Sequence, residues 1–118
     1  MVERDIRQAE FLRHMLGLLK LSKSKVLNQS IESLPKQSID LGMSRALGSI
    51  ANVTIQVTTL FKPESSLFHF KGDNWSTELS STPTQVFNSW KIDSVGEYSL
   101  PKETGTRHIV VSNRLSGE

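Results

Sequence analysis

The sequence predicts an α+β fold in which two or three N-terminal helices pack on an antiparallel sheet of five or six strands. Two observations lead to this prediction. Apolar residues recur at helical spacing before Ala51, and they alternate with polar residues after it. Because no helical pattern remains in the second half to connect parallel strands, we expect antiparallel pairing.

The most regular helical pattern covers residues 3–21. When each residue is turned by about 100°, one broad arc collects the apolar side chains. These are Phe11, Leu12, Met15, Leu16, Leu18 and Leu19. Glu3 and Asp5 near the start and Lys20 near the end also suit the helix dipole. We therefore expect a helix here.

Two shorter helical patterns follow. The first covers residues 26–34 and ends at Pro35, because the residue before a proline disfavours helical geometry. Ser38 is a candidate cap for the second, which spaces its apolar residues in helical rows. These are Ile39, Met43, Leu47 and Ile50. Gly42 and Gly48 weaken this helix, since each costs about 1 kcal/mol relative to alanine.

Strand patterns dominate the rest of the chain. The residues of 52–61 alternate between two faces and are mostly β-branched, which predicts a half-buried strand ended by Pro63. One face carries Val53, Ile55, Val57, Thr59 and Phe61. Residues 67–70 and 75–80 flank Lys71-Gly72-Asp73-Asn74, a hairpin signal. Further alternating stretches cover 86–92, 98–100 and 108–111, with a turn at 101–105. We expect one domain over 1–118, with a helical part at 1–51, an antiparallel β part at 52–112 and a loose tail at 113–118.

Composition excludes several chemistries. The 118 residues include no cysteine, which rules out disulfides, thiolate ligands and thiol nucleophiles. The N-terminus begins with charged residues and lacks the pattern of a secretory signal, and no apolar run reaches the roughly 20 residues that span a bilayer. We therefore expect a cytoplasmic protein.

No pattern in the sequence identifies a catalytic, cofactor-binding or metal site. The three histidines, His14, His69 and His108, lie in different predicted elements without metal-ligand spacing. Gly42 and Gly48 are too far apart for a dinucleotide-binding loop. The sequence therefore supports no enzyme and no cofactor, and an enzyme is kept only as the last alternative, which a histidine, a carboxylate and a serine gathered in one cleft would revive.

A weak nucleic-acid signal is also present. The net charge is only +2. Lys20, Lys23, Lys25 and Lys36 are candidate polyanion contacts, whose binding would depend strongly on salt. Aromatic residues on predicted strands could stack on bases, although such residues more often form the core. They are Phe68, Phe70, Trp75, Phe87 and Trp90.

Three functional hypotheses remain open. The first is a non-enzymatic protein-interaction or assembly module that self-associates or binds a partner protein through Phe11, Leu12, Met15, Leu16 and Leu19. The same arc could instead pack on the chain's own sheet or, less well, lie on a membrane. The second hypothesis is a scaffold that binds a small apolar ligand near Phe68, Phe70, Trp75 and Trp90. The third is a salt-sensitive nucleic-acid-binding domain.

Overall fold

The computed structural model describes residues 1–45, 48–103 and 105–116. Contacts divide the chain into two compact units, Met1–Pro35 and Lys36–Glu118. Leu47 of the predicted third helix, Thr104 of the predicted turn and the last two residues of the predicted tail lie outside the described residues. The single domain over 1–118 stays a prediction.

The Met1–Pro35 unit contains the predicted first helix. Helix α1 covers Ile6–Leu18, and its N-cap Asp5 accepts hydrogen bonds from the backbone N–H groups of Arg7 and Gln8. The predicted helix at 26–34 is wrong. Only the 3-10 turn η1 forms there, over Ile31–Ser33, while Leu27 makes a parallel bridge to Val2.

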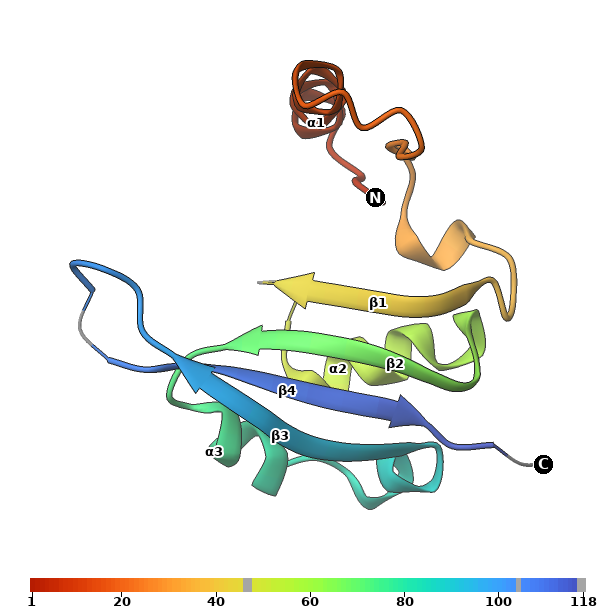
Figure 1. The fold of residues 1–118 in the computed structure, drawn as a ribbon. Coiled ribbons are helices and arrows are strands. Elements are labelled where there is room, and N and C mark those ends of the chain that lie inside the picture. Colours follow the sequence, from red (N-terminus) through yellow and green to blue (C-terminus); the bar gives the residue numbers. More distant parts are fainter. Residues whose placement is uncertain (46–47, 104, 117–118) are drawn as a thin grey trace. The chain divides into compact units, whose positions relative to one another are not determined.

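The Lys36–Glu118 unit contains a mixed four-stranded sheet. Its elements are β1 (Ile39–Arg45), α2 (Ile50–Val57), η2 (Thr58–Leu60), β2 (Phe61–Lys71), α3 (Trp75–Ser80), η3 (Thr84–Asn88), β3 (Trp90–Tyr98) and β4 (Arg107–Arg114). The strand order is β1-β2-β4-β3, with β1 parallel to β2 and the other pairs antiparallel. Figure 1 shows α2 and α3 on the same side of this sheet. The predicted antiparallel sheet of five or six strands is therefore wrong.

The predicted helix at 39–50 is wrong, because Ile39–Arg45 form strand β1 and Ile50 is already the first residue of α2. Gly42 explains the close packing of this strand, since a Cβ there would lie 2.6 Å from Cζ of Phe61 and 3.2 Å from Cδ1 of Leu67. The side chains of Leu41 and Met43 are exposed, so the helical row of apolar residues was coincidental. Pairing with β2 decides the conformation of this segment.

The predicted strand at 52–61 is instead helix α2 with the turn η2. Two periods overlap in this segment. Val53 and Val57 fit both alternation and a helical row, but Ile55, which only alternation would bury, is 58% exposed. Ser49 caps the helix by accepting a hydrogen bond from the N–H of Asn52. Helix α2 therefore provides the crossover that parallel strands need.

The predicted hairpin around 71–74 is also wrong, because residues 75–80 form helix α3. Trp75, Glu78 and Leu79 are all partly buried, at the i, i+3, i+4 spacing of a helix face. The predicted stretch at 86–92 divides into η3 and the start of β3. The predicted last strand is confirmed, and it extends to Arg114 in the expected tail.

The core of the Lys36–Glu118 unit lies between the sheet and its helices. It consists of Ile50, Val53, Val57, Leu60, Phe61, Leu67, Val86, Trp90, Ile92 and Val110, while Val111 is buried on the other face of the sheet, where it is paired with Phe68. Trp90 is 1% exposed, contacts Phe61 edge-on with ring centroids 5.4 Å apart, and donates from Nε1 to Oγ1 of Thr58. Among the described residues, no helix is long and apolar enough to cross a membrane.

Candidate functional site

The candidate site is a cavity of about 460 Å³ at the carboxyl ends of β1 and β2. These ends coincide because the strands are parallel, and Arg45 at the end of β1 is paired in register with Phe70 near the end of β2. Met43, Ser44, Arg45, Phe70, Tyr98, Leu100 and Arg107 line it. In open α/β sheets, ligands bind beyond the carboxyl ends of parallel strands. Its position therefore suits a ligand site.

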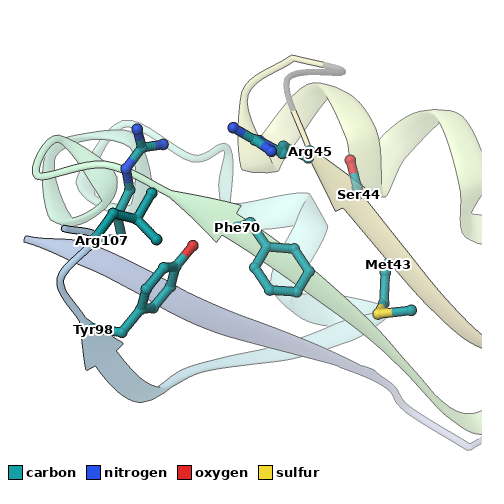
Figure 2. Close-up of a pocket in the computed structure, with 7 residues that line it drawn as sticks. Met43, Ser44, Arg45, Phe70, Tyr98 and Arg107 are labelled. Carbon is teal, nitrogen blue, oxygen red and sulfur yellow. The ribbon is translucent and has the colours of Figure 1, made fainter. Parts of the chain in front are cut away.

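Four strands and one loop residue bring unlike chemical groups together in this cavity. Tyr98 of β3 is paired in register with Arg107 of β4, which places both beside Phe70. Figure 2 shows the Phe70 ring between Tyr98 and Met43, with the guanidinium groups of Arg45 and Arg107 toward the same cavity. Two aromatic rings and two guanidinium groups can hold a planar, negatively charged ligand.

The two arginines differ in their partners. Nη2 and Nε of Arg107 donate to the same Oε2 oxygen of Glu103, at 2.8 and 3.2 Å. This hydrogen bond, with the charge of Glu103, raises the pKa of Arg107 and orients its guanidinium. Arg45 is exposed and forms no ion pair with another described residue. Its charge is therefore available to a ligand.

Lys71 at the end of β2 has a structural partner. Its Nζ lies 3.0 Å from Oε1 of Glu78 and donates to the carbonyl oxygen of Gly48 at 2.7 Å. The same carboxylate oxygen accepts the backbone N–H of Ile50, the first residue of α2. A carboxylate at this position satisfies a free N–H and suits the helix dipole. Lys71 and Glu78 therefore fix Gly48 and the start of α2.

A buried histidine lies on the opposite face of β2. His69 is 1% exposed, its Nε2 is 2.8 Å from Oγ of Ser112, and its Nδ1 has no hydrogen-bond partner among the described residues. Burial, helped by the charge of Lys71, lowers the pKa of His69 to about 4. The imidazole is therefore neutral at pH 7.

The predicted polyanion contacts divide between the two units. Lys20 and Lys25 line a cavity of about 650 Å³ in the Met1–Pro35 unit, together with Arg13. Lys23 is exposed nearby in sequence without lining that cavity, and Lys36 is exposed in the other unit. Their role stays a prediction.

The predicted partner-binding arc lies on α1, except for Leu19, which follows the helix as its C-cap. Phe11 and Leu19 are 61% and 60% exposed, whereas Leu12, Met15 and Leu16 are partly buried. Partner binding by these five residues also stays a prediction.

The strand aromatics do not form the single apolar pocket proposed for a small ligand. Only Phe70 lines the candidate site, while Trp90 is buried in the core and Trp75 lies against His108 with ring centroids 5.6 Å apart. Phe68 is partly buried and Phe87 is 41% exposed.

Sequence reasoning missed Arg45, Tyr98 and Arg107. Each stands at the end of a strand, but the strand β1 was predicted as a helix, so its carboxyl end was not considered. Within the described residues, no group of three potential ligands from histidine, cysteine, aspartate and glutamate could hold a metal ion.

Comparison with known proteins identifies the family. A family model described as "GidB: rRNA small subunit methyltransferase G" matches residues 1–110. Ribosomal RNA small subunit methyltransferase G 3 of Bdellovibrio bacteriovorus is 40% identical over 102 residues, which cover 86% of this chain and 46% of that protein. The Paracoccus denitrificans ribosomal RNA small subunit methyltransferase G is 33% identical over 93 residues, covering 79% and 46%. The chain thus spans about half the length of the curated relatives it matches.

Solved structures support the same fold. The tRNA (m1A58) methyltransferase TrmI of Aquifex aeolicus matches with a TM-score of 0.74 at 11% identity, over 99% of this chain and 53% of that chain. A SAM-dependent methyltransferase of Methanosarcina mazei matches with a TM-score of 0.69 at 15% identity, over 98% and 81%. The mixed sheet is therefore that of a Rossmann-like methyltransferase fold.

These matches overturn the functional predictions from sequence. The hypothesis of a non-enzymatic interaction or assembly module is wrong, as are the prediction that the protein is no enzyme and the description as a homo-oligomeric assembly protein. The apolar residues that suggested an assembly module lie in the N-terminal segment of a chain that matches an enzyme family. The chain belongs to the GidB family, that of rRNA small subunit methyltransferase G.

Proposed function

We propose that this chain provides the RNA-binding part of a methyltransferase that acts on the RNA of the small ribosomal subunit. The family match suggests the reaction, and the cavity beside Phe70 suggests where RNA binds. The observation that carries the proposal is the combination of two aromatic rings and two guanidinium groups in that cavity. Unpaired bases stack on aromatic side chains, and guanidinium groups bind phosphate.

In this proposal the cavity holds one nucleotide in an unstacked state. The rings of Phe70 and Tyr98 contact the base, and Arg45 binds a neighbouring phosphate. Arg107, held by Glu103, contributes a second, oriented positive charge. An enzyme that acts on a base must expose it, and a pocket that accepts the exposed base selects the substrate. The chain's role is therefore to bind and orient the base.

The residues of this chain do not fit S-adenosylmethionine on their own. Rossmann-like folds hold their cofactor at a glycine-rich turn that follows a parallel strand. Here each of the two parallel strands is followed by a single glycine, Gly48 after β1 and Gly72 after β2. Gly42 lies within β1, where the space beside it is filled by Phe61 and Leu67. The proposal therefore assigns RNA binding, and not cofactor binding, to these residues.

The basic residues of the Met1–Pro35 unit are candidates for further phosphate contacts. Lys20, Lys25 and Arg13 share one cavity, and Lys23 is exposed two residues from Lys25. Lys36 belongs to the same proposal. Each phosphate contact on single-stranded RNA contributes about −0.7 to the slope of log affinity against log salt. Contacts by these lysines would therefore steepen the salt dependence without adding sequence preference.

The test measures binding of the whole chain to a short single-stranded fragment of small-subunit rRNA by fluorescence anisotropy at several salt concentrations. We expect Tyr98→Ala to weaken binding by roughly 5-fold or more, since stacking contributes about 1–3 kcal/mol per base. Arg45→Ala should weaken binding and reduce the salt slope by about 0.7. Lys91→Ala, an exposed change on β3 outside the cavity, is the control.

Two results would contradict the proposal. One is affinity for RNA that the Arg45 and Tyr98 substitutions leave unchanged relative to Lys91→Ala. The other is no detectable binding by the parent chain even at low salt, where phosphate contacts are strongest.

A further inference from the structure

Glu103 is an acidic residue that is bonded directly to the candidate site without lining its cavity. Its Oε2 oxygen accepts hydrogen bonds from two nitrogens of Arg107, Nη2 at 2.8 Å and Nε at 3.2 Å. A carboxylate at this position opposes phosphate binding, because like charges repel each other. Glu103 therefore restricts what Arg107 can bind.

The local sequence explains how Glu103 reaches this position. Residues 100–103 form a tight turn, in which the N–H of Glu103 donates to the carbonyl oxygen of Leu100 at 3.3 Å. A proline in second place and a positive φ in third place, 65° at Lys102, are the marks of a type II turn. Leu100 also lines the cavity, so the turn attaches Glu103 to the cavity wall.

The contact with Glu103 leaves one side of the Arg107 guanidinium unused. This group has five N–H donors in one plane, and Glu103 takes the Nε donor and one Nη2 donor. The remaining donors have no hydrogen-bond partner within the part of the chain that the structure describes. Because the guanidinium is rigid, fixing one of its sides fixes the direction of the other. Since Arg107 lines the cavity (Figure 2), its free donors are available to a ligand there.

Arg45 and Arg107 are therefore suited to different parts of a nucleotide. The charge of Arg45 has no ion-pair partner among the described residues, whereas the charge of Arg107 is balanced by Glu103. An uncompensated charge favours phosphate, which carries no information about the base. A base edge instead requires N–H donors that are aligned in its own plane. Arg45 meets the first requirement and Arg107 meets the second.

We propose that Glu103 is a positioning residue that directs Arg107 toward the base, and away from the phosphate, in the RNA cavity. Glu103 fixes the plane of the guanidinium, and the free N–H groups of Arg107 donate to acceptor atoms on the edge of the base held by Phe70 and Tyr98. Arg45 binds the phosphate. This inference rests on the proposed function, and it adds the residue pair that gives the cavity a preference among the four bases.

The experiment separates the charge of Glu103 from its hydrogen bonds. Glu103→Gln keeps an oxygen that accepts from Arg107 but removes the charge, whereas Glu103→Ala removes both. Fluorescence anisotropy measures the affinity of the whole chain for short RNAs that carry one base, A, C, G or U, on an otherwise abasic strand, at several salt concentrations. Glu97→Gln is the matched control, since it removes the same charge from an exposed residue next to Tyr98 that points to the other face of β3.

We expect the parent chain to distinguish the best base from the worst by at least about 5-fold, the lower end of what a pair of hydrogen bonds to a base edge provides. Glu103→Ala should reduce this difference below about 2-fold and steepen the salt slope by up to about 0.7, because Arg107 is then free to bind phosphate. Glu103→Gln should raise the affinity for all four RNAs by roughly 2- to 5-fold and keep the base preference. Glu97→Gln should leave the base preference and the salt slope unchanged.

A second measurement reports the contact without RNA. In a nitrogen-15 spectrum of the arginine Nε–H groups, the Arg107 signal should keep its position in Glu103→Gln and shift in Glu103→Ala. Circular dichroism checks that the variants fold.

Three results would overturn the role of Glu103: no base preference in the parent chain, a preference that Glu103→Ala retains, or one that Glu103→Gln loses as completely as Glu103→Ala. In each case, RNA binding that still depends on Arg45 and Tyr98 leaves the proposed function standing. RNA binding that ignores Arg45 and Tyr98 contradicts the proposed function, and the base preference fails with it. The Arg107 signal then shows whether the contact with Glu103 exists apart from any RNA.

Discussion

Acidification should destabilise the Lys36–Glu118 unit through His69. The imidazole is buried against Ser112, and burial lowers its pKa from 6.5 to about 4. Between these values the unfolded chain binds one proton that the folded chain excludes, so stability is complete above pH 6.5 and falls as the pH approaches 4. One pKa unit corresponds to about 1.4 kcal/mol, which gives a loss of about 3 kcal/mol over the interval. Small domains have about 5–15 kcal/mol in total, so this loss is large.

Urea unfolding at pH 7.5, 6.5, 5.5 and 4.5 measures the effect. Both tryptophans, Trp75 and Trp90, lie in this unit, so their fluorescence reports its unfolding. We expect the free energy of unfolding to fall by about 2 kcal/mol between pH 7.5 and 4.5. His69→Gln keeps an N–H donor near Ser112 but removes the titration, so most of the pH dependence should disappear. His14→Gln, an exposed change in the other unit, should retain it.

The reasoning is refuted if His69→Gln and the parent chain lose stability equally with falling pH. Equal behaviour would place the responsible groups among the carboxylates. It would also mean that the folded protein accepts a proton on His69, for which Nδ1 would need a partner that the described residues do not provide.

Two further changes test the packing of the sheet. Gly42→Ala should destabilise the unit by about 1–3 kcal/mol in urea unfolding, because its Cβ would lie 2.6 Å from Cζ of Phe61, and Gly96→Ala, with no atom within 4 Å of the added Cβ, should not. Equal stability of the two alanine variants would argue against the close approach of β1 to Phe61. Trp90→Phe should cost about 1–2 kcal/mol in thermal unfolding followed by circular dichroism, because it removes the 3.0 Å hydrogen bond to Thr58 and part of a buried ring. A Trp75→Phe variant with the same or a larger loss would contradict the assignment of Trp90 to the core.

The sequence predicted an element correctly only where the spacing of apolar residues fits one kind of secondary structure, either a helix or a strand. Helix α1 was predicted because Asp5, the apolar arc and Lys20 all agree. Strand β4 was predicted because residues 109–111 are β-branched and follow a turn signal. Helix α2 was missed because Val53 and Val57 satisfy both a strand and a helix pattern. Which of the two patterns forms depends on which side chains become buried, and this depends on the parts of the chain that pack against the segment.

The candidate site could not be predicted for a related reason. Its residues are separated by up to 64 positions, from Met43 to Arg107, and only the parallel pairing of β1 with β2 and the antiparallel pairing of β3 with β4 brings them together. At residues 39–61 the prediction exchanged a strand and a helix, since β1 was expected to be helical and α2 to be a strand. Without β1 there was no parallel pair of strands, so the site at the carboxyl ends of β1 and β2 could not be predicted. The prediction of no enzyme had a different origin, because it rested on the absence of a recognisable catalytic or cofactor motif in the sequence.

By itself the sequence determined that the chain has no thiol chemistry, because it contains no cysteine, and it determined the positions of helix α1 and strand β4. Tertiary structure decided the rest: which of two overlapping periods is buried, why Gly42 stands inside a strand, and how two arginines and two aromatic rings share one cavity. The physical reason is that strand pairing and core packing are interactions between distant residues, and their free energy outweighs the small local preferences of a segment.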